Sequence, residues 1–141
     1  MNEDMLKLKS QLCFPLYACS REVIKKYKEF LDPLGLTYTQ YIVMMVLWEQ
    51  KSVNVKSLGE QLYLDSGTLS PLLKKMEAQG ILSRNRDASD ERNVIVTITP
   101  KGESLKDKAI TIPEKIGSCI NLDYEDARIL YTLLYKVLGV L

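Results

Sequence analysis

Residues 54–80 constrain the fold most, because they predict two short helices separated by a tight turn. The first helix is expected over about 55–62, opened by Asn54, whose side chain is a good N-cap. The second is expected over about 68–79, close behind the first. Two short helices around a tight turn that contains glycine match a helix-turn-helix.

The limits of the second helix follow from residues with special backbone preferences. Pro71 has no N–H and is therefore expected only in a first turn, where that donor has no partner to lose. Gly80 is a natural C-terminal stop. Three side chains at the start of the helix can act as caps: Asp65, Ser66 and Thr68.

The hydrophobic periodicity changes after residue 80. Residues 81–86 and 93–99 are predicted to be β-strands, the second more strongly because it is rich in valine, isoleucine and threonine. The charged segment 87–92 between them predicts the tip of a hairpin. A helix-turn-helix followed by a β-hairpin is the winged form of the motif.

Further helices are predicted on both sides of this unit, over 14–31, from Thr37 to about 50, over about 101–118 and from Asp123 onward. The helix after Thr37 is apolar nearly all round, which is typical of a buried helix. A break at residues 32–35 separates it from the first helix. The sequence therefore predicts a single, mainly α domain over residues 1–141, with a small β-hairpin as its wing.

Composition limits the partners and the compartment. The net charge is only +1, so contact with nucleic acid must come from a local patch. The chain has no histidine and its three cysteines lie far apart, which argues against a structural metal, and no cofactor is indicated. The N-terminus is polar, and the longest apolar run, residues 41–48, is too short to span a bilayer. We therefore expect a cytoplasmic protein with no membrane partner.

The winged unit predicts contact with double-stranded DNA. The second helix of such a unit enters the major groove with its N-terminal residues toward the base edges, and helix N-termini also attract phosphate. An arginine at a narrow hairpin tip can reach a minor groove or the DNA backbone, and Asp90 is expected to hold Arg92 in position. The candidate DNA-binding residues are Ser66, Thr68, Ser70, Lys74, Lys75, Arg84, Arg86, Asp90 and Arg92. A solvated hairpin, or a winged fold used only for protein contacts, is the alternative.

The first and last helices carry more apolar residues than one buried face needs. Ile129 and Leu133, for example, lie off the stripe that Leu130 and Leu134 define. Packing against a second copy would bury these residues and would present two DNA-recognition (reading) helices to a pseudo-palindromic operator. Packing of the same residues within one subunit is the alternative. The predicted division is residues 6–36 and 101–141 for a homodimer interface and residues 53–99 for DNA binding.

Cys13 is a candidate reactive thiol because of its place before a helix. Pro15 suits the first helical position, which puts Cys13 at the positive end of the helix dipole. A thiol there tends to ionise more easily, and the thiolate is the reactive form. The alternative is a small buried apolar residue, which is what most free cysteines are.

These features resemble the MarR family of winged-helix regulators along essentially the whole chain. The sequence Arg-Asp-Ala-Ser-Asp-Glu-Arg at 86–92 is similar to the wing signature of that family. Three segments resemble the organic-hydroperoxide-sensing repressors, the OhrR group: Gln-Leu-Cys-Phe at 11–14, Thr-Tyr-Thr-Gln-Tyr at 37–41 and Leu-Asp-Ser-Gly-Thr-Leu-Ser-Pro-Leu-Leu-Lys at 64–74.

The resemblance implies a dimeric repressor, not an enzyme, that senses organic hydroperoxides and releases operator DNA when its N-terminal cysteine is oxidised. Cys13 would be the redox sensor, and Tyr27 and Tyr38 of the partner subunit would hydrogen-bond its thiolate. Cys119 resembles the resolving cysteine that closes an intersubunit disulfide. Since Cys13 and Tyr27 lie fourteen residues apart on one helix, about 21 Å, they can meet only between antiparallel helices of two subunits. Plain core aromatics are the alternative for both tyrosines.

Two residues depart from the family pattern, and other functions stay open. Pro15 follows the sensor closely, and Cys19, about 240° round the helix from Cys13, is expected to be a buried spacer. If Cys119 does not resolve the sensor, a small thiol would cap it or it would oxidise further. The main alternative is a MarR-type repressor released by a small aromatic ligand or an electrophile. A thiol peroxidase would leave the wing arginines without a purpose.

Overall fold

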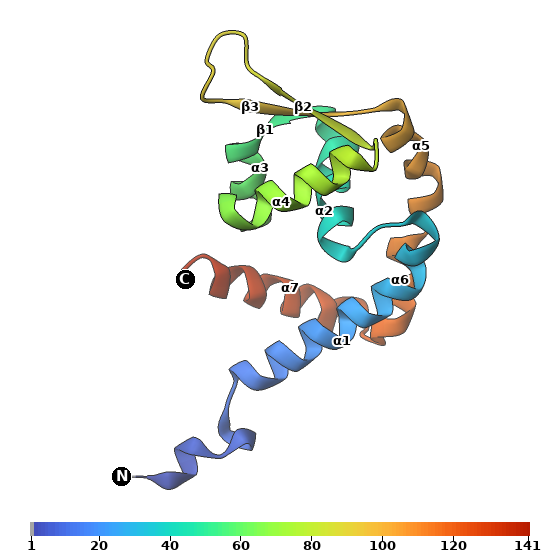
Figure 1. Cartoon of the computed structure of the whole chain (residues 1–141). Coiled ribbons are helices and arrows are strands. Elements are labelled where there is room, and N and C mark those ends of the chain that lie inside the picture. Colours follow the sequence, from blue (N-terminus) through green and yellow to red (C-terminus); the bar gives the residue numbers. More distant parts are fainter. Residues whose placement is uncertain (1) are drawn as a thin grey trace.

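The structure is a computed structural model, and it describes residues 2–141, which form seven α-helices and one three-stranded sheet (Figure 1). The helices are α1 (Cys13–Leu31), α2 (Tyr38–Gln50), α3 (Val55–Leu62), α4 (Ser66–Ala78), α5 (Pro100–Ala109), α6 (Ile112–Ile120) and α7 (Tyr124–Leu138). The strands are β1 (Ser52–Asn54), β2 (Leu82–Arg86) and β3 (Val94–Ile98). Short 3-10 turns cover Glu3–Leu6, Leu8–Ser10 and Asp32–Leu34.

Helix α2 is the buried centre of the molecule, as its apolar sequence predicts. Val43, Met44 and Leu47 have no exposed surface. Thr37 and Gln40 cap the helix reciprocally, because each side chain accepts a hydrogen bond from the backbone N–H of the other. This capping box satisfies Gln40, which is the one buried polar side chain among the described residues.

Helices α3 and α4 form the predicted helix-turn-helix. Asn54 caps α3 by accepting the Ser57 N–H at 2.7 Å. A Cβ at Gly59 would lie 2.7 Å from the Leu64 carbonyl oxygen, so the close approach between α3 and the turn requires glycine.

The prediction that Pro71 lies in the first turn of α4 is wrong. Asp65 caps the helix by accepting the Thr68 N–H at 2.7 Å, and α4 therefore begins at Ser66, two residues earlier than expected. Pro71 then lies in the second turn. The hydrogen bond that it cannot donate would have gone to the Gly67 carbonyl, and both residues are exposed, so water can replace the missing donor.

The sheet joins the hairpin to the helix-turn-helix. Its order is β1-β3-β2 and both pairings are antiparallel. Val96 of β3 is opposite Val53 on one side and Arg84 on the other, and it is fully buried. Strand β1 was not predicted, because three residues are too few to show a period. It fixes the base of the wing to the start of α3.

The prediction of a single helix over 101–118 is wrong. The chain forms α5 and α6 there, with a break at residues 110–111. Pro113 explains the break, because it has no N–H to donate to the Ala109 carbonyl four residues earlier and its ring crowds that carbonyl, so the helix does not continue through this point. It lies instead in the first turn of α6, where proline is tolerated.

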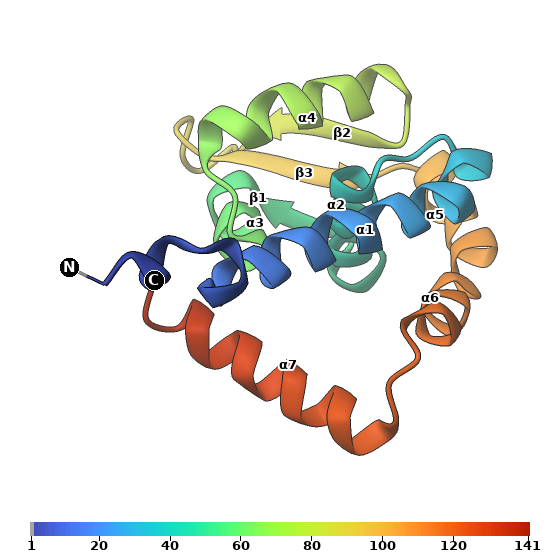
Figure 2. The same ribbon diagram turned by 90° about the horizontal axis from the view of Figure 1, so that it is seen from below.

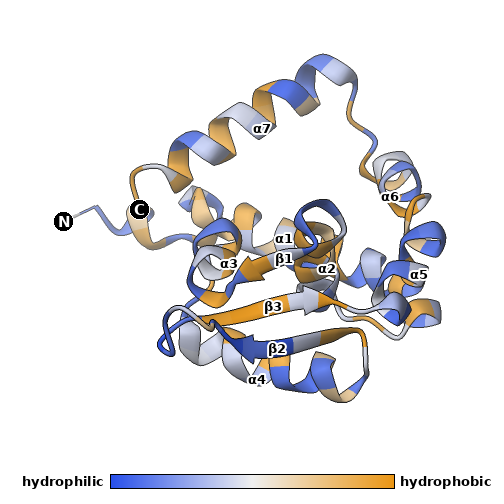
Figure 3. Ribbon diagram, turned by 90° about the horizontal axis from the view of Figure 1, so that it is seen from above, coloured by the Kyte–Doolittle hydropathy of each residue, from blue (hydrophilic) through white to orange (hydrophobic). Residues whose placement is uncertain are grey.

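Helices α1 and α7 extend away from this core. Figures 1 and 2 show α7 running back from α6, so that both chain termini lie on the same side of the molecule. No residue of α7 is buried, and Figure 3 shows apolar residues along it while it stands apart from the winged unit. Ile129 and Leu133 are 44% and 52% exposed. The single chain thus leaves a large apolar surface uncovered.

Within residues 2–141, no single helix is long and apolar enough to cross a membrane. The first helix with its 3-10 extension, Cys13–Leu34, and α2 reach such a length and composition only as a pair that is bent by 66°.

Candidate functional site

Helix α4 presents a polar face to solvent. Its buried residues, Leu69, Leu73 and Met76, fix the opposite face against the core. The five residues predicted on this helix for DNA contact are all exposed: Ser66, Thr68, Ser70, Lys74 and Lys75. The structure therefore leaves these hydroxyl and ammonium groups open to solvent along α4.

The N-terminus of α4 is already occupied by a carboxylate. Hydrogen bonds from Thr68 lower the pKa of Asp65 below its usual value, so this carboxylate stays ionised at the helix end. A phosphate placed at the same end would meet this negative charge. The positive end of the helix dipole is thus partly neutralised by Asp65, whereas the hydroxyl and lysine side chains along the helix are not.

The start of α4 and the end of the wing share one hollow. A groove of about 710 Å³ lies between α3, α4 and the start of β3, and Ser66 and Arg92 both line it. Lys56 and Tyr63, which the sequence did not single out, line the same groove. Lys56 is an additional positive charge on this surface that no sequence pattern marked.

Arg92 is presented at the wing tip by the acidic residues beside it. The Asp90 carboxylate accepts the backbone N–H of Arg92 at 3.0 Å, so Asp90 holds the Arg92 main chain rather than its guanidinium. Asp87 accepts the Ser89 N–H and hydroxyl at 3.0 and 2.8 Å, which lowers the pKa of Asp87. Among the described residues, no carboxylate lies within ion-pair distance of the exposed Arg92 guanidinium.

The other two wing arginines are bonded to groups of the protein itself, Arg84 in a part-buried contact and Arg86 at the exposed hairpin tip. The Arg84 guanidinium lies 3.2 Å from a Glu77 carboxylate oxygen, and the Arg84 backbone N–H donates to the second oxygen at 2.8 Å. These contacts lower the pKa of Glu77 and join α4 to β2. Arg86 donates to the Glu91 carbonyl at 2.8 Å and braces the hairpin tip. Only Arg92 of the three extends from the described hairpin without such a partner.

Cys13 is the first residue of α1 and is exposed. Tyr17 lies one turn farther along the helix, and the Arg21 guanidinium lies 5.2 Å from the centre of its ring. The sequence interpretation missed Tyr17 and Arg21, although the spacing of four residues places each on the same side of the helix as the residue before. The prediction that Cys19 is buried is wrong for the single chain, since Cys19 is exposed on a part of α1 that the rest of the chain leaves open.

A cluster of three tyrosines joins the other end of α1 to the start of α2. The ring centres of Tyr27 and Tyr38 lie 4.8 Å apart, and that of Tyr41 lies 5.7 Å from Tyr27 and 6.3 Å from Tyr38. Burial, together with the neighbouring phenols, raises the pKa of Tyr27 to about 12, and burial also raises the pKa of Tyr38 and Tyr41. All three are therefore neutral hydrogen-bond donors near pH 7.

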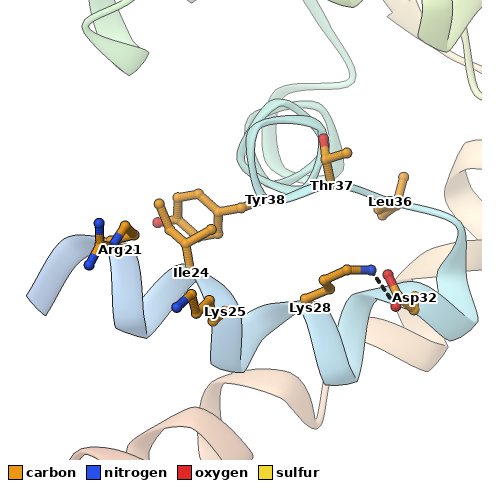
Figure 4. A pocket seen from close by; sticks show the side chains of 8 residues that line it. All are labelled: Arg21, Ile24, Lys25, Lys28, Asp32, Leu36, Thr37 and Tyr38. Atoms are coloured by element: carbon orange, nitrogen blue, oxygen red, sulfur yellow. Dashed lines mark hydrogen bonds and ion pairs between the residues drawn. The ribbon is translucent and has the colours of Figure 1, made fainter. Parts of the chain in front are cut away.

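A cavity of about 310 Å³ lies beside this tyrosine cluster, between α1 and the start of α2 (Figure 4). The Tyr38 ring points from α2 toward Ile24 of α1. The Lys28 and Asp32 side chains form an ion pair at 2.8 Å on its wall. The residues that line it are Arg21, Ile24, Lys25, Lys28, Asp32, Leu36, Thr37 and Tyr38.

The candidate sensor residues lie far apart within one chain. Cys13 and Tyr27 belong to the same helix, so its rise of 1.5 Å per residue separates them by about 21 Å along the axis. Cys119 is exposed near the end of α6. Helix α6 packs beside the last turns of α1, where the Lys115 ammonium lies 5.7 Å from the centre of the Phe30 ring. Cys119, one turn after Lys115, is thus nearer to the tyrosine end of α1 than to Cys13. Within residues 2–141, no group of three or more possible ligands is arranged to hold a metal.

Comparison with known proteins is consistent with this arrangement. The family model described as transcriptional regulator SarA/Rot matches residues 25–109. An organic hydroperoxide resistance transcriptional regulator of Bacillus subtilis is 49% identical over 138 residues, which cover 98% of this chain and 94% of that protein. The regulator SarZ of Staphylococcus saprophyticus is 40% identical over 127 residues, 90% of this chain and 87% of that protein.

Solved structures of AbfR, a protein of Staphylococcus epidermidis, are similar over nearly the whole chain. Reduced AbfR bound to DNA superposes with a TM-score of 0.81 at 34% identity, over 99% of this chain and 97% of that one. Overoxidised AbfR bound to DNA gives 0.80 and 34% over the whole of both chains, and disulfide-formed AbfR gives 0.66 and 36% over 96% of each.

These relatives are transcriptional regulators and not enzymes, and the fold, the polar face of α4 and the wing agree with that role. Escherichia coli MarR, at 23% identity and a TM-score of 0.69, shares the fold. The chain belongs to the MarR family of DNA-binding winged helix-turn-helix regulators, in the group of organic hydroperoxide resistance regulators.

Proposed function

We propose that this regulator is a homodimeric repressor that senses organic hydroperoxides through Cys13 and then releases operator DNA. One observation carries the proposal: Cys13 and the tyrosine cluster lie at opposite ends of the same helix. Two α1 helices that pair in antiparallel fashion across a two-fold axis would place each Cys13 beside the partner subunit's tyrosines. The neutral phenols would then stabilise the thiolate by donating hydrogen bonds to it.

The exposed apolar surface supports this dimer. The first half of α1 and the whole of α7 expose large apolar side chains, among them Phe14, Leu16 and Tyr131. Covering such a surface with a second copy removes it from water. We therefore assign residues 6–36 and 101–141 to the dimer interface and residues 53–99 to DNA binding.

The sensing chemistry has two steps. The Cys13 thiolate attacks one peroxide oxygen and breaks the O–O bond, which gives a sulfenic acid and an alkoxide that takes up a proton to become an alcohol. The Cys119 thiolate of the partner subunit then attacks the sulfenic sulfur. An S–S bond forms and hydroxide leaves, taking up a proton to become water.

The AbfR structures support a role for the second step. That protein has been seen on DNA in its reduced and its overoxidised states, and separately in a disulfide form. We infer that the disulfide, and not oxidation of Cys13 alone, changes the separation of the two reading helices. A change in affinity of about 1.4 kcal/mol would already weaken DNA binding tenfold.

The DNA contacts follow from the exposed groups. Ser66, Thr68 and Ser70 would face base edges or phosphates in the major groove, with Lys74 and Lys75 on the backbone. Arg92 would reach a minor groove or a phosphate from the wing tip. Arg84, Arg86 and Asp90 would act on DNA through the shape of the wing, because their side chains are held by protein groups.

The test compares wild-type protein with Cys13→Ser and with Cys19→Ser as a matched control. The DNA probe is a labelled duplex that the reduced wild-type protein selects from a random-sequence pool. Cumene hydroperoxide is expected to release wild-type protein and Cys19→Ser from the duplex, while Cys13→Ser stays bound. Release of Cys13→Ser to the same extent would refute Cys13 as the sensor.

The cavity between α1 and α2 supports a second candidate function. Its volume of about 310 Å³ and its mixture of apolar and cationic walls would suit a small aromatic acid. A regulator of this kind would leave DNA on binding such a ligand, with Cys13 incidental. Release of Cys13→Ser protein by salicylate, without any peroxide, would favour this alternative.

A further inference from the structure

Gln79, directly after α4, touches three separate segments of the chain. Its side-chain Nε2 donates to the Gly35 carbonyl in the turn between α1 and α2, at 3.4 Å. Its backbone carbonyl accepts from the Lys101 ammonium of α5 at 2.8 Å. Its backbone N–H donates to the Lys75 carbonyl at 3.0 Å and so closes the last turn of α4.

Gly35 lies directly before three residues that line the cavity between α1 and α2, namely Leu36, Thr37 and Tyr38. Gly35 has a left-handed backbone, with φ 71°, and its N–H bonds to the Asp32 carbonyl at 3.0 Å. The next residue, Leu36, is 5% exposed and lines the cavity together with Tyr38. Only Leu36 and Thr37 lie between Gly35 and Tyr38 in the chain. A displacement of Tyr38 would therefore be transmitted along this short stretch of backbone to the Gly35 carbonyl.

The Gln79 amide is only partly satisfied. Its Oε1 atom is buried and has no hydrogen-bond partner within residues 2–141. The reverse orientation would set this oxygen against the Gly35 carbonyl oxygen, so the contact with Gly35 fixes the amide as it stands. At 3.4 Å the bond is longer than the usual 2.9–3.0 Å of an N–H···O bond, so a small shift of the turn either strengthens it or breaks it.

We propose that Gln79 is a positioning residue that couples the α1–α2 turn to the reading helix α4. The proposal rests on the peroxide-sensing function above, which supplies the signal. In the reduced protein the amide holds the end of α4 against the turn. When the disulfide displaces the start of α2, the Gly35 carbonyl moves and the end of α4 follows or is released. The tilt of the reading helix, and with it DNA affinity, then depends on the state of the sensor.

Two variants test this role. Gln79→Met keeps the length of the side chain and removes the donor, and Gln79→Glu keeps its shape but sets a carboxylate against the Gly35 carbonyl. Gln50→Met is the matched control, because it removes the hydrogen bond that Gln50 Nε2 donates to Gln61 Oε1 at 2.8 Å, on an exposed surface away from the turn. Dissociation constants for the selected duplex are measured before and after cumene hydroperoxide, and mass spectrometry measures the fraction of oxidised Cys13.

Wild type and Gln50→Met are expected to lose affinity about tenfold or more on oxidation, a typical size for coupling between sites. Both Gln79 variants should oxidise Cys13 to the same extent and bind the duplex when reduced, yet lose affinity less than about threefold. A full loss of affinity on oxidation of Gln79→Met would overturn the proposal. So would loss of DNA binding by both reduced variants, because Gln79 would then only shape α4. Wild-type protein that holds DNA with Cys13 and Cys119 fully joined would instead refute the sensing function itself.

Discussion

Replacing Arg92 with alanine is expected to weaken DNA binding and to reduce the slope with which the binding constant falls as salt concentration rises. The Arg92 guanidinium is exposed, lines the same groove as Ser66, and has no carboxylate within ion-pair distance in the described part of the chain. A dimer brings two such arginines to the duplex. The logarithm of the binding constant changes by about 0.9 for each neutralised phosphate per logarithmic unit of salt, so losing two contacts reduces the slope by about 1.8.

Arg84→Met is the matched control for this experiment. The Arg84 guanidinium already pairs with Glu77 at 3.2 Å, so its removal should leave the salt slope unchanged. It should instead lower the free energy of unfolding slightly, because it removes the partly exposed ion pair between Arg84 and Glu77. Fluorescence anisotropy with the selected duplex, from about 50 to 200 mM salt, measures both slopes. Equal slopes for the two variants would refute the assignment of Arg92 as the arginine that reaches DNA.

Three other changes test separate parts of the structure. Gly59→Ala would place a Cβ 2.7 Å from the Leu64 carbonyl oxygen, so urea denaturation should show a loss of about 1–3 kcal/mol. Because the pKa of Tyr27 is raised to about 12, the native state keeps a proton that the unfolded chain loses near pH 10. The free energy of unfolding should therefore be constant below pH 10 and fall toward pH 12, and this fall should be smaller in Tyr27→Phe. Leu133→Glu puts a charge on the exposed apolar face of α7, and sedimentation should show more monomer than for wild type; an unchanged dimer would remove α7 from the interface.

Local signals explain which parts of the fold the sequence could predict. Asn54, Thr37 and Asp123 each predict the start of a helix, and each side chain caps its helix in the structure. The hairpin followed from the β-branched residues of β3. A capping side chain bonds to a backbone N–H about three residues later, and the alternation of a strand shows within about five residues. Both features are therefore visible in a short stretch of sequence.

The errors occurred where one local signal overruled another or where distant segments met. The Asp65 cap moved the start of α4 and placed Pro71 inside the helix, and Pro113 divided the long helix expected before Ser118. Strand β1 depends on its pairing with β3, which lies more than forty residues away. The sequence predicts that Cys19 is buried, whereas it is exposed in the single chain, because burial depends on neighbours that the local sequence does not specify.

The candidate site was predictable only in part, for the same reason. The positions of Cys13 and Tyr27 at opposite ends of one helix follow from sequence spacing alone. Nothing in the local sequence distinguishes the roles of Arg84 and Arg92. Only the contact of Glu77 with β2 shows that Arg84 is held by the protein while Arg92 is exposed. Gln79 carries no motif, and its contact with Gly35 joins residues 44 positions apart.

In the proposed mechanism, a Cys13–Cys119 disulfide between subunits releases the regulator from DNA. The most direct measurement is the redox state of both cysteines after limiting organic hydroperoxide, determined by mass spectrometry on the same samples in which duplex binding is measured. We predict that the fraction of protein released equals the fraction that carries the intersubunit disulfide, and that Cys119→Ser forms no covalent dimer. Release while both thiols remain reduced, or full disulfide formation with DNA still bound, would contradict the claim.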